Sequence, residues 1–188
     1  MKVYIAGRIG YERNRFGLPV DIYRHEDEYW ITDYPTFVFR SHTLTYTGPF
    51  TVSCDHGCAH QFKHAVGPTC GNDSMYLGPD EKIEGYHFQK ALRDLVVRKT
   101  TQGIKDADAV FVWLSDNSEI AHGTLTEIGY AAALQKPIYI GCTSKDSDQT
   151  WYAKSLATRN YCANNLEFKT FFAWALSDHL TFVRPACK

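Results

Sequence analysis

One stretch, residues 107–141, constrains the fold more than any other part of the chain. It contains an apolar run at residues 110–114, a polar loop, a segment with apolar residues at helical spacing, and a second apolar run at residues 138–140. The first run is uninterrupted, as expected of a strand that is covered on both faces. Lys136 and Pro137 end the helical segment. This strand–loop–helix–strand order predicts a parallel sheet with helices packed on it.

Glu127 is the candidate catalytic residue of this stretch. Ligands of parallel α/β sheets bind beyond the carboxyl ends of the strands, which is where the loop at residues 115–122 would lie. The pattern places Glu127 in the first turn of the following helix, where the helix dipole and free N–H groups would keep its carboxylate ionised at neutral pH. An ionised carboxylate suits nucleophilic attack on a sugar carbon better than acid catalysis. The alternative is that Glu127 only complements the helix dipole.

The 188 residues are predicted to form a single α/β domain with a doubly wound parallel sheet, Rossmann-like or flavodoxin-like. Residues 2–6 form its opening strand. Residues 20–75 are a β-rich and loop-rich insertion, in which alternating aromatic residues around Gly48-Pro49 predict a hairpin or meander. Helices are expected after residue 78, at 151–158 and at 166–180. The last of these is rich in phenylalanine, so it either closes a face of the sheet or forms a subunit interface.

Composition excludes some classes of function. A net charge of −1 gives no broad positive field, so neither nucleic acid nor an anionic membrane is expected as a partner. No apolar run approaches the roughly 18 residues of a membrane span, and the chain opens on a strand instead of a signal segment. We therefore expect a cytoplasmic protein. Its six cysteines are expected to be thiols or metal ligands, not a disulfide framework.

Residues 54–70 hold three cysteines and three histidines. Zinc takes such ligands, although the spacing matches no standard zinc finger or ribbon, and a bound zinc could be structural or hydrolytic. A second interpretation is a lid that brings Asp55, His56 and His60 over Glu127 as acid/base groups. A third is a polar loop with neither role. No other cofactor is expected. The zinc ligands would be Cys54, Cys58, His60 and Cys70.

The sequence G-T-L-T-E-I-G-Y at residues 123–130, with its two flanking strands, resembles the signature of the nucleoside 2-deoxyribosyltransferase family. The opening K-V-Y-I-A-G-R is similar to that family as well. The family's glutamate attacks the anomeric carbon of the sugar, and a tyrosine on the first strand orients it. The resemblance implies these roles for Glu127 and Tyr4. It also implies cleavage of a nucleoside N-glycosidic bond without a redox cofactor, and a homo-oligomer in which a neighbouring subunit completes the site.

Two positions depart from the family pattern. Thr100 stands where an acid of the preceding helix usually faces the base, and Ala121 stands where an aspartate usually serves proton transfer to the leaving base. Asp116, Glu119 or His122 could supply that proton. His122 is the candidate catalytic acid because its ring titrates near neutral pH.

The other predicted contacts to a nucleoside or nucleotide lie at strand ends and in loops. Trp113 could stack on a planar base, although a core role is equally consistent with its position. Two further functions stay open. One is a nucleotide 5′-monophosphate N-glycosidase, with Arg8, Arg13 or Arg98 at the phosphate. The other is a non-catalytic nucleotide-sensing module. The residues predicted to bind substrate are Ala6, Gly7, Arg8, Asp55, His56, His60, Asp94, Trp113, Asp116, Asn117 and Gly123.

Overall fold

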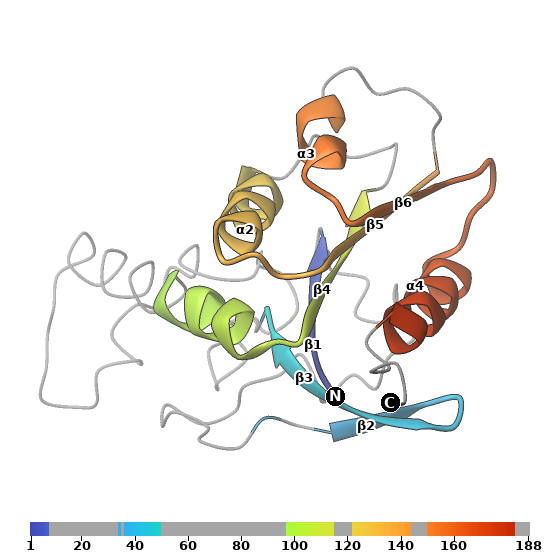
Figure 1. Ribbon diagram of the computed structural model, residues 1–188, viewed down its shortest axis with the longest axis horizontal. Helices are drawn as coiled ribbons and strands as arrows, with labels where there is room; N and C mark the ends of the chain where they lie inside the picture. Colours follow the sequence, from blue (N-terminus) through green and yellow to red (C-terminus); the bar gives the residue numbers. More distant parts are fainter. Residues whose placement is uncertain (8–33, 35, 50–96, 115–121, 144–149, 183–188) are drawn as a thin grey trace, which may run out of the picture.

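A computed structural model describes residues 1–7, 34, 36–49, 97–114, 122–143 and 150–182 of the chain (Figure 1). Within them, six strands form one sheet in the order β2-β3-β1-β4-β5-β6. All neighbouring strands run parallel except β2 and β3, which are antiparallel. The strands are β1 (Lys2–Gly7), β2 (Thr36–Phe39), β3 (His42–Gly48), β4 (Ala109–Leu114), β5 (Ile138–Cys142) and β6 (Arg159–Cys162).

The five parallel strands follow the flavodoxin-like order, in which the first strand lies between the second and the third. Helices cover both faces of this sheet, which confirms the predicted doubly wound α/β class. Figure 1 shows α2 and α3 on one side of the sheet and α4 on the other. The helices are α2 (His122–Ala133), α3 (Trp151–Ser155), α4 (Phe168–Phe182) and a helical segment at residues 97–106.

Successive side chains of each strand point to opposite faces of the sheet, so the core is divided into two clusters. Val3 and Ile5 of β1 face α4, together with Phe111 of β4. Tyr4 and Ala6 face the opposite side, where the cluster includes apolar residues of the 97–106 helix and of α2. Each strand in the middle of the sheet is therefore buried on both faces, as its uninterrupted apolar sequence predicted.

Aromatic rings form the layer between α4 and the sheet. The ring of Phe172 packs edge-on against that of Phe111, with centroids 4.8 Å apart. Gly141 of β5 lies directly beneath Phe171, since a Cβ at residue 141 would come within 2.4 Å of that ring. This contact requires glycine. The aromatic helix predicted at residues 166–180 thus exists, and its buried side closes one face of the sheet.

The predicted hairpin is present but is placed differently. Strands β2 and β3 are joined through Arg40 and Ser41, and Arg40 has a φ of 54°. Gly48, where a turn was also expected, ends β3 and is joined to Pro49 by a cis peptide bond, while the second run expected after it lies outside the described residues. Strand β3 pairs with β1, so the hairpin extends the main sheet. Apart from Tyr34 and residues 36–49, the predicted insertion lies outside the described residues.

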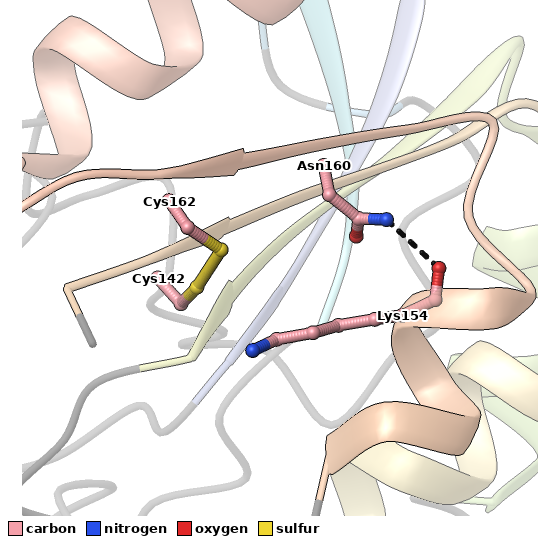
Figure 2. The surroundings of a disulfide bond; sticks show 4 residues. All are labelled: Cys142, Lys154, Asn160 and Cys162. Atoms are coloured by element: carbon pink, nitrogen blue, oxygen red, sulfur yellow. Dashed lines mark hydrogen bonds between the residues drawn. A yellow bond between two sulfur atoms is a disulfide. The ribbon is translucent and has the colours of Figure 1, made fainter. Parts of the chain in front are cut away.

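The helix expected at residues 151–158 ends earlier, at Ser155, and the unpredicted strand β6 follows it. Cys142 and Cys162 are register partners on β5 and β6, and they form a disulfide with Cα atoms 5.0 Å apart (Figure 2). The expectation of reduced thiols is therefore wrong for these two. Adjacent positions on neighbouring strands bring two cysteines within bonding reach. The other four cysteines lie outside the described residues.

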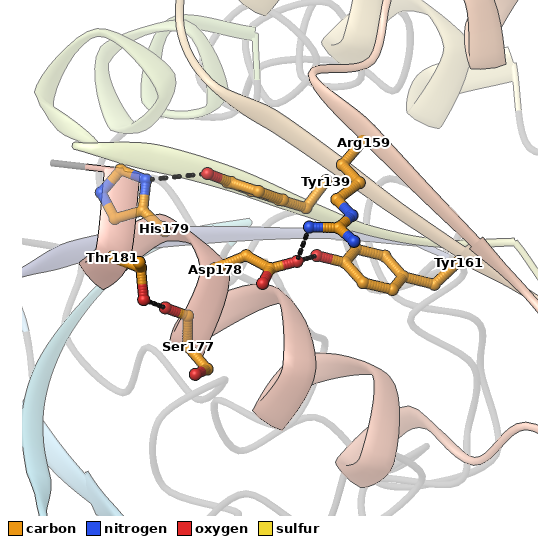
Figure 3. A network of polar contacts seen from close by, with 7 residues as sticks. All are labelled: Tyr139, Arg159, Tyr161, Ser177, Asp178, His179 and Thr181. Carbon is orange, nitrogen blue, oxygen red and sulfur yellow. Dashed lines mark hydrogen bonds and ion pairs between the residues drawn. The ribbon is translucent and has the colours of Figure 1, made fainter.

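Side chains of α4 bind the outer strands through a polar network (Figure 3). Tyr161 of β6 donates a hydrogen bond to the Asp178 carboxylate, and Arg159 forms an ion pair of 2.7 Å with the same carboxylate. Tyr139 of β5 shares a hydrogen bond of 3.2 Å with Nδ1 of His179. These contacts fix α4 on the edge of the sheet. Across the described ranges, no helix is long and apolar enough to cross a membrane.

Candidate functional site

Tyr4 and Glu127, both predicted to be catalytic, lie side by side. The Tyr4 hydroxyl donates a hydrogen bond of 2.7 Å to Oε1 of Glu127. Tyr4 comes from β1 and Glu127 from α2, which follows the neighbouring strand β4. The strand order reverses direction at β1 and β4, and sites of open α/β sheets lie at this switch point. The contact therefore joins two distant parts of the chain at the expected place.

The position of Glu127 within its helix corrects one prediction. Helix α2 begins at His122, so Glu127 lies in the second turn, and the first turn holds no acidic residue. The free N–H groups of a helix belong to its first four residues, which precede Glu127. Burial raises the pKa of Glu127 to about 7, while the hydrogen bond from Tyr4 lowers it. The carboxyl group is thus poised between its charged and neutral forms at neutral pH, instead of being held fully ionised.

The phenol of Tyr4 is a permanent hydrogen-bond donor. Its side chain is fully buried. Burial raises the pKa of Tyr4 well above 10, and the nearby charge of Glu127 raises it further. Tyr4 therefore keeps its proton across the physiological range and can always donate to the carboxylate.

The helix at residues 97–106 packs directly against Tyr4. A Cβ at Gly103 would lie 2.1 Å from the carbonyl oxygen of Thr47 and 3.3 Å from Cδ2 of Tyr4. Thr100 lies one turn before Gly103 on the same helix, and its side chain offsets a small part of the rise that burial causes in the pKa of Tyr4. In the sequence, Thr100 stands out only as a departure from the family pattern. The one available signal was its i, i+3 spacing from Gly103, which places both residues on one face of the helix.

Two predicted substrate contacts lie near this pair. Ala6 is buried on the same face of β1 as Tyr4. Gly7 ends the strand with a φ of 152°, a conformation that residues with side chains rarely adopt. Gly7 therefore presents no side chain at the carboxyl end of β1, where a sugar is expected to bind.

Trp113 does not belong to this site, which corrects its predicted role. Its side chain is only 6% exposed and lies on the opposite face of the sheet. The indole ring stacks on Phe171 with centroids 5.7 Å apart and meets Phe168 edge-on. Because Val110 and Val112 face α2, the alternation of β4 turns residue 113 toward α4. Trp113 is a core residue and cannot stack on a base held near Glu127.

The remaining predicted residues are described in part or not at all. The backbone of His122 forms the first residue of α2, while its side chain lies outside the described part of the chain; the exposed Gly123 follows it. No group of three metal-ligating side chains exists among the residues whose placement is described. The other predicted positions fall outside the described residues: Arg8, Cys54, Asp55, His56, Cys58, His60, Cys70, Asp94, Asp116 and Asn117.

A cleft of about 390 Å³ lies away from this site, between the turn of the β2–β3 hairpin and helix α4. Arg40 and His42 line one side, and Ser177 and Thr181 line the other. Since α4 covers the face of the sheet opposite to Tyr4, this cleft is separate from the Tyr4–Glu127 pair.

Comparisons with known proteins agree with the motif on α2. The family model described as nucleoside 2-deoxyribosyltransferase matches residues 36–167, well over half of the chain and including Glu127. Among solved structures, that of a CMP N-glycosidase from Clostridium botulinum is similar over 45% of this chain and 69% of that one. The two share 21% sequence identity, with a TM-score of 0.36. The search of curated proteins finds no match.

Proposed function

Because the chain belongs to the nucleoside 2-deoxyribosyltransferase family, whose members are N-glycosyl transferases or hydrolases, we propose that it cleaves the N-glycosidic bond of a nucleoside with Glu127 as the nucleophile. The hydrogen bond between Tyr4 and Glu127 is the observation that carries this proposal. It orients a carboxylate at the switch point of the sheet, beside the side-chain-free end of β1. A glutamate that only complemented the helix dipole would need no such partner.

The proposed reaction has two displacements at C1′ of the sugar. An oxygen of Glu127 forms a bond to C1′ while the C1′–N bond breaks. The electron pair of the broken bond stays on the base nitrogen, which takes up a proton from an acid. A nitrogen of a second base, or a water molecule, then attacks C1′. The glutamyl ester breaks, the carboxylate returns, and the attacking group loses a proton. Since Tyr4 holds Oε1, we assign the attack to Oε2.

The environment of Glu127 supports a nucleophilic role. Burial removes water from the carboxylate, which raises its pKa to about 7 and makes it more basic than an exposed glutamate. Tyr4 counteracts part of this effect by stabilising the charged form. The result is a carboxylate that is still ionised in a large fraction of molecules at neutral pH and has lost much of its water shell.

His122 is the proposed acid for the leaving base. Its backbone opens α2, five residues before Glu127, directly after the loop that follows β4. A histidine can hold a proton near neutral pH and release it to a base nitrogen. We expect His122→Asn to slow release of the base while Glu127 still titrates as in the wild type.

A substrate panel tests the proposed function. Nucleosides and nucleoside 5′-monophosphates are incubated with and without an acceptor base, and chromatography measures released base and exchanged nucleoside. Exchange indicates a transferase, and free base without an acceptor indicates a hydrolase. Preference for the monophosphates would favour the nucleotide N-glycosidase. Glu127→Gln, which keeps the hydrogen bond of Tyr4 to a side-chain oxygen, is expected to abolish turnover and retain the fold.

Two results would overturn the catalytic proposal. One is release of base by Glu127→Gln at the wild-type rate. The other is tight nucleotide binding with no release of base over a long incubation, which would favour the non-catalytic sensing module. The size of the protein in solution, measured by light scattering, tests the expected homo-oligomer.

A further inference from the structure

The cleft between the β2–β3 hairpin and α4 combines a cationic side chain with hydroxyl groups and an apolar base. Its volume of about 390 Å³ is within the range of small-molecule sites. Arg40 and His42 come from the hairpin, and Ser177 and Thr181 come from α4. No acidic side chain of the described ranges lines it. The charge of the cleft therefore favours an anion.

Arg40 has a backbone conformation that residues with a long side chain seldom adopt. It is the first residue of a two-residue turn, since Phe39 and His42 are register partners, and its φ is 54°. Glycine, asparagine and aspartate are the usual residues of positive φ in such turns. An arginine is strained there, and strained positions are often retained because the side chain serves a function. The turn alone does not account for this arginine.

The guanidinium of Arg40 lies at the cleft. Its Cζ is 6.0 Å from the centroid of the Phe39 ring, which also lines the cleft. Phe39 is itself held edge-on against Phe172, with centroids 4.8 Å apart. Within the part of the chain that the structure describes, no carboxylate forms an ion pair with Arg40. Its planar set of donors can therefore bind two oxygens of a ligand side by side.

Helix α4 supplies the opposite wall. The Thr181 hydroxyl donates to the carbonyl oxygen of Ser177 over 2.8 Å, so its proton is used within the helix (Figure 3). The Ser177 hydroxyl forms no such bond to another described residue and can donate across the cleft. The neighbouring Asp178 does not oppose an anion here, because its carboxylate is bound by Arg159 and Tyr161 of β6.

We propose that this cleft binds a small phosphomonoester with an apolar or aromatic body. Arg40 and Ser177 would bind the phosphate oxygens from opposite walls. A phosphate has three terminal oxygens, so one remains for Ser177 after the guanidinium has bound two. A carboxylate has only two oxygens and would leave that hydroxyl without a partner. The body of the ligand would contact the apolar base, which consists of Ala173, Leu176 and Leu180.

This site is distinct from the proposed catalytic pair. Tyr4 packs on the face of the sheet that α2 covers, whereas the cleft lies beside α4 on the other face. A ligand in the cleft therefore cannot reach Glu127, and the inference stands whether or not the chain cleaves a nucleoside.

Three variants separate the parts of the site. Arg40→Asn removes the guanidinium and places a residue that tolerates positive φ in the turn. Ser177→Ala removes the donor of the opposite wall. The matched control is Lys169→Gln, which removes one positive charge from an exposed position of α4 that does not line the cleft.

Titration by NMR with phenyl phosphate tests the proposal. The backbone amide signals of ¹⁵N-labelled protein are followed, and we expect saturable changes at residues 40–42 and 177–181. Inorganic phosphate lacks the body and benzyl alcohol lacks the charge, so each should bind at least about tenfold more weakly. Arg40→Asn should weaken binding by about tenfold or more, as expected for a lost hydrogen bond to a charged group, and Ser177→Ala by about threefold or more. Lys169→Gln should bind like the wild type.

Thermal unfolding without ligand supplies a second readout. Arg40→Asn should unfold at a higher temperature than the wild type because the turn is relieved of strain, which also shows that the variant folds. A lower unfolding temperature would assign Arg40 to the turn and overturn the inference. Unchanged binding in Arg40→Asn, an equal loss in Lys169→Gln, or changes confined to the surroundings of Tyr4 and Glu127 would overturn it as well.

Discussion

Tyr4 donates a hydrogen bond to Glu127 over 2.7 Å, and burial keeps the phenol protonated while the carboxyl group titrates. The two groups therefore do not compete for a proton near neutral pH. Tyr4 acts as a constant donor, and only Glu127 changes its charge. The charge of this one carboxyl group controls both the proposed chemistry and part of the protein's stability.

Removal of the phenol hydroxyl should raise the pKa of Glu127 further above its present value of about 7. Tyr4→Phe keeps the ring and deletes the donor. A hydrogen bond to a charged group contributes about 1.5–3 kcal/mol, so the shift is expected to be about one to two pKa units. The acid limb of the kcat/KM profile should move to higher pH, with a loss of roughly tenfold or more at pH 6.

Tyr152→Phe is the control for that change, because its hydroxyl belongs to a side chain that is 62% exposed on α3. It should leave the profile unchanged. A Tyr4→Phe enzyme with the wild-type pH profile would contradict the role assigned to Tyr4.

Stability should depend on pH through Glu127. The folded pKa of about 7 lies above the unfolded value of 4.5, so the folded state binds this proton more tightly. The resulting stabilisation is fully present below pH 4.5 and is lost as the pH rises through about 7. The loss amounts to about 3–4 kcal/mol at most, from roughly 1.4 kcal/mol for each of the 2.5 pKa units. Glu127→Gln should therefore gain stability relative to the wild type at pH 8 but not at pH 4.

Urea unfolding at the two pH values measures this difference. Glu167→Gln, at an exposed carboxyl group just before α4, is the matched control and should show no such pH-dependent gain. If the free energy of unfolding depended on pH equally in Glu127→Gln and the wild type, Glu127 would not be buried in its charged form.

Gly103→Ala should destabilise the fold by several kcal/mol or prevent folding, since overpacking usually costs about 1–3 kcal/mol and here the Cβ meets a backbone carbonyl that cannot rotate away. The helix would have to move off β3 and Tyr4. Gly129→Ala is a control in α2, where a Cβ would meet nothing within 4 Å. Alanine in an open helical position is expected to stabilise by about 0.5–1 kcal/mol. Thermal unfolding of both variants measures the contrast.

The Cys142–Cys162 disulfide closes a loop of 20 residues across β5 and β6. A loop of this length is expected to contribute about 3 kcal/mol through the entropy of the unfolded chain. A reductant should lower the unfolding temperature of the wild type and leave that of a Cys142→Ser, Cys162→Ser double variant unchanged. Insensitivity of the wild type, with Cys142 and Cys162 themselves identified as labelled thiols by peptide mass spectrometry, would show that the two cysteines are not joined.

The central strands and helices were predictable because each has a strong pattern of its own. The apolar run of β4, the helical spacing of α2 and the aromatic face of α4 are local features, and all three exist as expected. The pairing of Tyr4 with Glu127 followed from the family motif. β6 was missed because it is a short edge strand of four residues with little burial, so it has no apolar pattern to detect.

The errors arose from properties that depend on packing. A strand covered on both faces is apolar at every position, so its sequence does not reveal that Trp113 faces α4 and not the site. The charge of Glu127 depends on how much water reaches it, which only the surrounding chain decides. The disulfide requires two strands to be neighbours in register, and one of those strands was not predicted.

Strand β1 carries Tyr4 and has a hydrogen-bonded neighbour on each side, β3 and β4. Its amide protons can exchange with solvent only when the sheet itself opens, so they should be among the slowest in the protein to exchange for deuterium. Tyr4 therefore lies on a strand that we expect to move little relative to the rest of the sheet. Within the described residues, an adjustment that admits the proposed nucleoside is therefore expected in α2, which carries Glu127, and not in β1.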